Sequence, residues 1–136
     1  MTRALLGLGI LFGVAAGCQL PPEKLPVKPL PEDSAPLPYP DVVSRACAQA
    51  SAAVEAFYLD KWDELESAAQ ALEQSARFLT KATDVPANRK DDLATHSAEL
   101  VKTASLLRDA AKKKDVQQAN EQLQRINLRV RELRPE

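Results

Sequence analysis

Residues 62–79 read WDELESAAQALEQSARFL, and apolar or alanine side chains recur in them at alternating steps of three and four residues. The positions are Trp62, Leu65, Ala69, Leu72, Ala76 and Leu79. This spacing places them on one face of an α-helix and is typical of the seam of a helical bundle. A single helix cannot bury such a face by itself, so this stretch predicts partner helices elsewhere in the chain.

Three more segments carry stripes of the same kind. One runs through residues 41–57, with Val43, Ala46, Ala50, Ala53 and Phe57. A second consists of Leu93, Ser97, Leu100, Ala104, Leu107 and Ala111, and a third of Val116, Ala119, Leu123, Ile126, Val130 and Leu133. Together with residues 62–79 they predict a domain over 41–136 that is built from four helices.

Polar residues that stabilise helix N-termini stand at the start of each predicted helix. The expected caps are Asp41, Asp60 and Asn88, with Asp115 and Gln118 forming a capping box for the last helix. The short connections predict an all-α fold, an antiparallel up-down four-helix bundle. The break at residue 60 contains neither proline nor glycine. The alternative is therefore one long helix through the first two segments, in a helical hairpin or an oligomeric coil.

The composition of the chain excludes or disfavours several classes of function. All four glycines lie before residue 18, at Gly7, Gly9, Gly13 and Gly17. Residues 18–136 contain no glycine, so they cannot form the phosphate-binding loops of nucleotide-binding motifs and cannot easily form tight β-hairpins. The formal net charge of −1 does not favour nucleic-acid binding. No nucleophile stands in a recognisable arrangement with a base, so we expect no enzyme activity and no cofactor.

Residues 18–40 form a proline-rich segment ahead of the helices. They contain Pro21, Pro22, Pro26, Pro29, Pro31, Pro36, Pro38 and Pro40. Proline removes backbone donors and fixes φ, so we expect a disordered tether with polyproline II character. At about 3.1 Å per residue, residues 19–40 would reach roughly 65–70 Å. The alternative is a proline-rich ligand for another protein.

Residues 1–17 have the features of a secretory signal. Arg3 precedes an apolar and glycine-containing stretch over 4–16, which is shorter than the roughly 20 residues that cross a bilayer. The stretch ends in Ala15-Ala16-Gly17-Cys18, which resembles the lipobox of bacterial lipoproteins, although that family usually has leucine where Ala15 stands. The alternative is an ordinary secretory signal or an uncleaved anchor.

The lipobox resemblance has specific consequences for Cys18. It implies cleavage before Cys18, a diacylglyceryl thioether on its sulfur, and a fatty acyl group such as palmitate on its new amino group. The residue after the cysteine is Gln19. By the same resemblance, Gln19 favours transfer to the outer membrane, with the domain on its periplasmic face.

The helical domain also resembles the cytochrome c-prime class of periplasmic four-helix bundles. Asp115, Ala119 and Leu123 stand at spacings similar to those of that family's last helix. The haem-attachment motif CxxCH would fall at residues 126–130, which read INLRV and contain neither cysteine nor histidine. The resemblance therefore implies a relative of that bundle without its haem.

One group of residues has the spacing of metal ligands. Asp92, His96 and Glu99 would lie on one face of the third helix and resemble half of a metal site in a helical bundle. His96 is the only histidine, so a second set of ligands would have to come from another copy of the chain. The competing interpretation is a solvated face of the helix.

Cysteine and aromatic residues of the domain have two interpretations each. Cys47 lies beside the first helical stripe, as a buried inert thiol or as a partner in an intermolecular disulfide. The aromatic residues are Phe57, Tyr58, Trp62 and Phe78. They are expected to pack together at one end of the bundle, and the alternative is a ligand-binding patch.

Charged residues divide between the second and fourth helices. The arginines of the fourth are Arg125, Arg129, Arg131 and Arg134, and the acids of the second are Asp63, Glu64, Glu66 and Glu73. They would either pair with each other inside the bundle or leave the arginines for a partner protein or an acidic surface such as lipopolysaccharide phosphate.

The sequence thus predicts a lipid-anchored helical bundle of the cell envelope that acts as a non-enzymatic interaction or structural module. Its expected partners are the membrane, through the lipid on Cys18, and a protein or a second copy of the chain. The alternative function is periplasmic metal handling through Asp92, His96 and Glu99.

Overall fold

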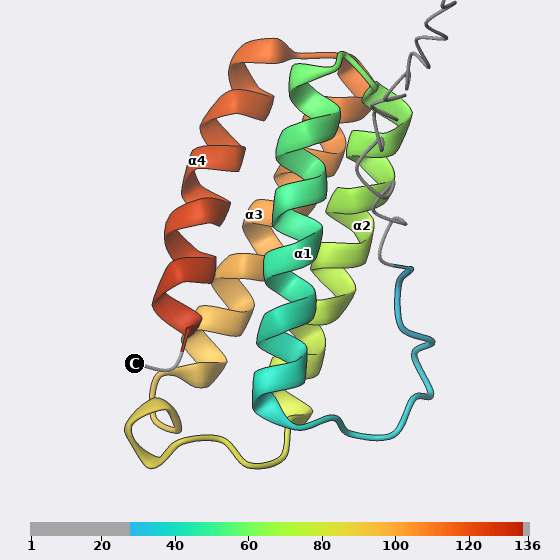
Figure 1. The fold of residues 1–136 in the computed structure, drawn as a ribbon. Helices are drawn as coiled ribbons and strands as arrows, with labels where there is room; N and C mark the ends of the chain where they lie inside the picture. Colours follow the sequence, from blue (N-terminus) through green and yellow to red (C-terminus); the bar gives the residue numbers. More distant parts are fainter. Residues whose placement is uncertain (1–27, 135–136) are drawn as a thin grey trace, which may run out of the picture.

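The computed structural model describes residues 28–134, and within this range the protein is all-α (Figure 1). The four α-helices are α1 Tyr39–Tyr58, α2 Trp62–Phe78, α3 Leu93–Lys113 and α4 Val116–Leu133, and two short 3₁₀ turns are η1 Leu79–Lys81 and η2 Ala87–Arg89. The predicted four-helix fold is confirmed. Cys18 and the whole lipobox-like stretch lie outside the described residues.

The helices pack in a ring in which α1 contacts α2, α2 contacts α3, α3 contacts α4 and α4 contacts α1. In Figure 1 the chain runs up through α1, down through α2, up through α3 and down through α4. In agreement with these directions, the Tyr39 hydroxyl at the start of α1 bonds to the Leu133 carbonyl at the end of α4. The α3/α4 face therefore lies opposite the α1/α2 face.

The first two helices are separate, so the alternative of one continuous helix is wrong. α1 ends at Tyr58 and α2 begins at Trp62. Between them Asp60 adopts a left-handed conformation with φ of 56°, which a helix interior does not allow for an L-residue. The Asp60 carboxylate accepts a hydrogen bond of 2.6 Å from the Trp62 indole and holds the turn.

Of the four predicted helix caps, only one forms. The Asp115 carboxylate accepts a hydrogen bond of 3.0 Å from the Gln118 backbone N–H, as predicted for α4. Asp41 lies inside the first turn of α1 instead, because Pro40 suits the first helical positions and lets the helix begin earlier. Asp60 is engaged by Trp62, and Lys61 takes the cap position of α2 without a side-chain bond. Asn88 lies in η2, and α3 begins after Asp92.

The predicted seam of α2 forms the centre of the core. Leu65, Ala69, Leu72, Ala76 and Leu79 are fully buried, whereas Trp62 at the start of α2 is half-buried. Alanine at every second position of this seam lets neighbouring helices approach closely. Ser97, the one polar residue in the predicted stripe of α3, donates a buried hydrogen bond of 2.6 Å to the Ala76 carbonyl. This bond satisfies the hydroxyl and fixes α3 against α2.

Residues 28–38, which we call the strap, differ from the expected free tether. Figure 1 shows them along the outside of the bundle beside α1 and α2. Leu30 and Leu37 pack against the core. The Leu37 carbonyl accepts a 3.0 Å hydrogen bond from the Thr83 backbone, and Arg45 donates to the Lys28 carbonyl at 3.3 Å. The strap therefore adds no free length to the tether that was expected over residues 19–40.

Tyr39 provides a test of the junction between α1 and α4. Its side chain is fully buried, and its hydroxyl donates a 2.6 Å hydrogen bond to the Leu133 carbonyl. Burial raises the pKa of Tyr39 above 10.0, against an opposing effect of Arg89. We expect Tyr39→Phe to lower the free energy of unfolding by about 1 kcal/mol at pH 7, because the Leu133 carbonyl loses its partner.

The same pKa shift predicts how the stability depends on pH. A raised pKa in the folded state means that the contribution of Tyr39 is present below pH 10 and is lost as the pH rises through the raised pKa. Urea unfolding at neutral and alkaline pH should therefore show a smaller alkaline loss in Tyr39→Phe than in the wild type. Tyr58→Phe is the matched control, because the Tyr58 side chain is exposed. Equal alkaline losses in all three proteins would contradict the assignment.

Candidate functional site

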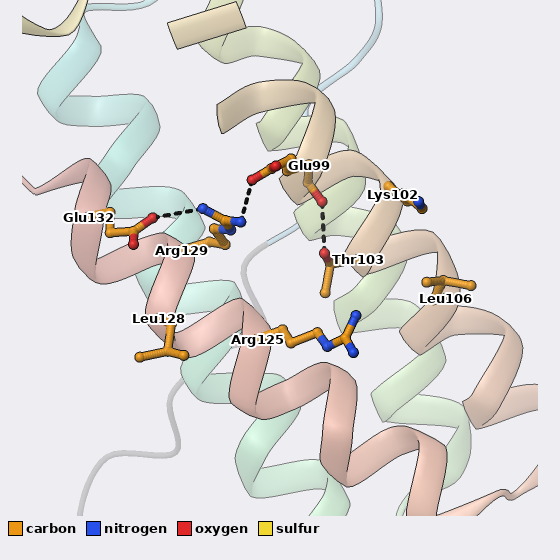
Figure 2. A pocket seen from close by; sticks show the side chains of 8 residues that line it. All are labelled: Glu99, Lys102, Thr103, Leu106, Arg125, Leu128, Arg129 and Glu132. Carbon is orange, nitrogen blue, oxygen red and sulfur yellow. Dashed lines mark hydrogen bonds and ion pairs between the residues drawn. The ribbon is translucent and has the colours of Figure 1, made fainter. Parts of the chain in front are cut away.

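A groove of about 440 Å³ runs between α3 and α4 (Figure 2). We call it the α3/α4 groove. It is lined by Glu99, Lys102, Thr103, Leu106, Arg125, Leu128, Arg129 and Glu132. It exists because the leucine and alanine stripes of both helices face the core and leave a furrow between their outer faces.

Two leucines flank this groove. Leu106 of α3 is 39% exposed and Leu128 of α4 is 59% exposed. Figure 2 shows them on either side of the groove, with the Arg125 side chain between the two helices. Neither leucine contributes to the buried core, although the other leucines of α3 and α4 do. The groove therefore presents apolar surface next to charge.

Arg129 closes one end of the groove. Its guanidinium lies 2.5 Å from the Glu99 carboxylate of α3 and 3.2 Å from the Glu132 carboxylate of α4. The Thr103 hydroxyl donates a 2.7 Å hydrogen bond to the Glu99 carbonyl. Lys102 has no carboxylate within 4.0 Å among residues 28–134. Its ammonium group is available to a partner from outside the bundle.

The predicted metal ligands do not form a cluster. His96 lies 3.8 Å from Glu132 of α4, measured from its Nδ1 to the carboxylate, and Glu99 is paired with Arg129. Asp92 is exposed at the N-terminal boundary of α3. Within the described range, no group of three or more His, Cys, Asp or Glu residues could hold a metal ion. The geometry gives the metal site no support.

The expected pairing between the acids of α2 and the arginines of α4 is wrong. These two helices lie diagonally across the bundle, and no ion pair joins them among residues 28–134. Glu73 of α2 pairs with Arg108 of α3, and Glu66 pairs with Lys112. The paired arginines of α4 are Arg125, which contacts Glu121 at 2.5 Å, and Arg129.

The aromatic residues do not all gather at one end. Phe57 contacts Tyr58 and Trp62 in edge-to-face geometry, with ring centroids 5.6 and 6.1 Å apart, at the junction of α1 and α2. Phe78 lies at the other end of α2, where Lys81 stands 5.7 Å from its ring centre. Cys47 is a free thiol, half-buried against the core.

Sequence reasoning did not identify Lys102, Leu106 and Asp109 as surface features. The available signal was their spacing of three and four residues on the helix face opposite the buried stripe of α3. A leucine in a charged, outward-facing stripe is an exception to the pattern of an amphipathic helix, and it marks surface that another molecule can cover.

Comparison with protein-family models, with curated proteins and with solved structures finds no match to this chain. The α3/α4 groove is therefore interpreted from its own residues. Among the helices of residues 28–134, none combines the length and the apolar character needed to cross a membrane.

Proposed function

We propose that this protein is a lipid-anchored module of the bacterial cell envelope that acts by binding another polypeptide rather than by catalysis. Acyl chains on Cys18 hold it to a membrane, with the outer membrane favoured by Gln19. The α3/α4 groove is the binding surface. The observation that carries the proposal is the sequence Ala15-Ala16-Gly17-Cys18 at the end of an apolar segment.

The physical argument for the anchor is the strength of acyl insertion. Each buried methylene contributes about 0.8 kcal/mol, so one chain binds reversibly and two or three chains hold a protein on a membrane. Residues 19–27 then connect the anchored cysteine to the strap and let the bundle stand up to roughly 30 Å from the lipid.

The argument for an interaction module comes from the α3/α4 groove. Leu106 and Leu128 expose apolar surface beside Lys102 and Arg125. Apolar side chains ringed by charges are typical of protein-binding surfaces. The groove is shallow, and Arg129 spans one end of it by pairing with Glu99 and Glu132. These features favour contact with a polypeptide over enclosure of a small substrate.

Replacing Cys18 tests the anchor directly. The full chain should be recovered in the membrane fraction of a bacterial host, with residues 1–17 removed and a mass that includes a diacylglyceryl group and a further acyl chain. In Cys18→Ala we expect loss of the acylated form and of membrane retention through it. Mass spectrometry of the N-terminal peptide and fractionation measure both results.

The second cysteine supplies the matched control. Cys47→Ala should remain acylated and membrane-bound, because Cys47 lies within α1 and far from the cleavage site in sequence. Recovery of an unmodified wild-type chain that still carries residues 1–17 would overturn the proposed anchor.

A further inference from the structure

The outer face of α3 carries a charge pattern with an internal symmetry. Five residues follow one another there in steps of three and four residues, which places them on one face of the helix. They are Glu99, Lys102, Leu106, Asp109 and Lys113. We call this set the α3 stripe. Its order is acid, base, leucine, acid, base, with Leu106 in the middle.

Reading the α3 stripe backwards reverses each charge. An antiparallel second copy of α3, centred on Leu106, would place Lys113 opposite Glu99 and Asp109 opposite Lys102. Each of these pairs would occur twice because of the twofold symmetry. Leu106 of one copy would meet Leu106 of the other. A parallel pairing would set like charges against each other, which costs free energy.

The charges of the stripe are largely free to pair outside the molecule. Lys102, Asp109 and Lys113 are exposed, and none has an ion-pair partner within 4.0 Å in the part of the chain that the structure describes. Glu99 alone is engaged, by Arg129. The central leucine is 39% exposed, and Leu128 lies beside the stripe across the groove (Figure 2).

We infer that the α3/α4 face binds a second copy of this chain, with the two α3 helices antiparallel about Leu106. This rests on the proposed function, since it names the partner of the same groove. A helix of 21 residues is about 31 Å long, and two adjacent helices are roughly 20 Å wide. The resulting face of roughly 600 Å² is at the lower end of the roughly 600–1,000 Å² per partner that specific interfaces bury.

The position of the strap is compatible with this dimer. The strap contacts α1 and Thr83 on the opposite side of the bundle and leaves the α3/α4 face uncovered (Figure 1). A twofold axis perpendicular to α3 can coincide with the membrane normal, and both anchors then reach one membrane at equal distance. Two copies held on one membrane also have a raised effective concentration, which suits an interface with few apolar residues.

Disulfide trapping in the full chain tests the symmetry. We expect Leu106→Cys, in a Cys47→Ala background, to form a disulfide-linked dimer when membrane and soluble fractions are treated with copper–phenanthroline in air, since the twofold axis brings the two new thiols together and the added oxidant accepts the two electrons that they release. Ser51→Cys on the exposed face of α1 is the matched control and should not exceed the background chain. The background chain without a new cysteine measures any linkage through Cys18. A yield for Leu106→Cys no higher than for Ser51→Cys would overturn the inference.

Charge reversal tests the register. Lys102→Glu and Asp109→Lys, each added to the trapping variant, should reduce the dimer yield by about tenfold, because each places two like-charge pairs in the interface. The double variant K102E/D109K restores opposite charges and should return the yield to near its original value. Failure of the double variant to recover would overturn the antiparallel pairing. If an acidic helix of a different protein occupies the groove instead, Leu106→Cys should give no more homodimer than Ser51→Cys, and that result would also overturn the inference.

Two readouts separate this inference from the proposed anchor. Circular dichroism of each variant confirms that the exposed substitutions leave the bundle folded. Mass spectrometry of the same samples reports acylation of Cys18. An acylated chain without trapped dimer refutes the dimer and leaves the anchor intact, whereas an unmodified chain with trapped dimer refutes the anchor alone.

Discussion

Leu107→Ala is expected to lower the free energy of unfolding by about 3–4 kcal/mol, because the substitution opens a cavity in the middle of the core. Leu107 of α3 is 0% exposed and belongs to the single core cluster that joins all four helices. The adjacent alanines Ala104, Ala110 and Ala111 have no side-chain atoms that could move in to fill the space. The free energy of unfolding of a domain is only about 5–15 kcal/mol in total, so Leu107→Ala would remove a large fraction of the stability.

Leu106→Ala is the matched control for this prediction. It removes the same atoms from the neighbouring position on α3, but Leu106 is part of the exposed stripe and not of the core. We expect a loss below about 1 kcal/mol when both variants are measured by urea unfolding at low protein concentration. A loss for Leu106→Ala as large as that for Leu107→Ala would mean that the assignment of the two faces of α3 is wrong.

Arg108→Leu is expected to lower the free energy of unfolding by about 2–3 kcal/mol, because it removes the ion-pair partner of the buried Glu73 carboxylate. Glu73 of α2 is a buried acid in the contact between α2 and α3. Its Oε1 accepts a 2.6 Å hydrogen bond from Arg77 of its own helix, and its Oε2 lies 2.9 Å from the Arg108 guanidinium of α3 in an ion pair without hydrogen-bond geometry. Arg77 is more than half exposed and cannot by itself replace the lost interaction across the helices.

Glu73→Leu should lower the free energy of unfolding by less than Arg108→Leu does, and this difference tests the explanation. In Glu73→Leu the two arginines lose a carboxylate but retain access to water, so the penalty for an unpaired buried charge does not arise. The double variant E73L/R108L should be more stable than Arg108→Leu alone. Urea unfolding of the three variants gives the coupling free energy. Additive losses, or a larger loss in Glu73→Leu, would show that the buried carboxylate is not the source of the effect.

The break between α1 and α2 shows where local sequence information was sufficient. The stripe of α1 ends at Phe57, and a new stripe begins at Trp62, so two helices were predicted although no glycine or proline separates them. The structure confirms the two helices but assigns Asp60 a different role. Its carboxylate binds the Trp62 indole, and its φ is positive. A propensity for capping cannot foresee this, because the competing donor is a side chain two residues away.

The strap shows where local information failed. Eight prolines in residues 18–40 predict a segment without helix or strand, and that much agrees with residues 28–38. Their position against the bundle depends on Thr83, which lies far along the chain. The Thr83 carbonyl accepts a hydrogen bond from the Tyr39 N–H, and the Thr83 N–H donates one to the Leu37 carbonyl. Proline content limits which local structures can form but does not determine what an extended segment contacts.

The α3/α4 groove was predictable in parts. The arginines of α4 were recognised as candidates for a partner, and two of them line the groove. Leu106 and Leu128 fall outside the predicted stripes, but they were not recognised as surface features. The periodicity separates Leu106 from its neighbour Leu107, whereas only the packing of α3 against α4 shows that Leu106 and Leu128 flank one groove.

The sequence by itself determined that this chain folds as four helices and, apart from the exposed Val116, which face of each helix is buried, because hydrophobic periodicity is a local property of a 3.6-residue helix. The tertiary structure decided which helices are neighbours. With α2 and α4 on a diagonal, the acid–base pairing considered between them does not form, and Glu73 pairs with Arg108 of α3 instead. Ion pairs and grooves depend on side chains from different helices, and their distances follow from the packing order of the bundle.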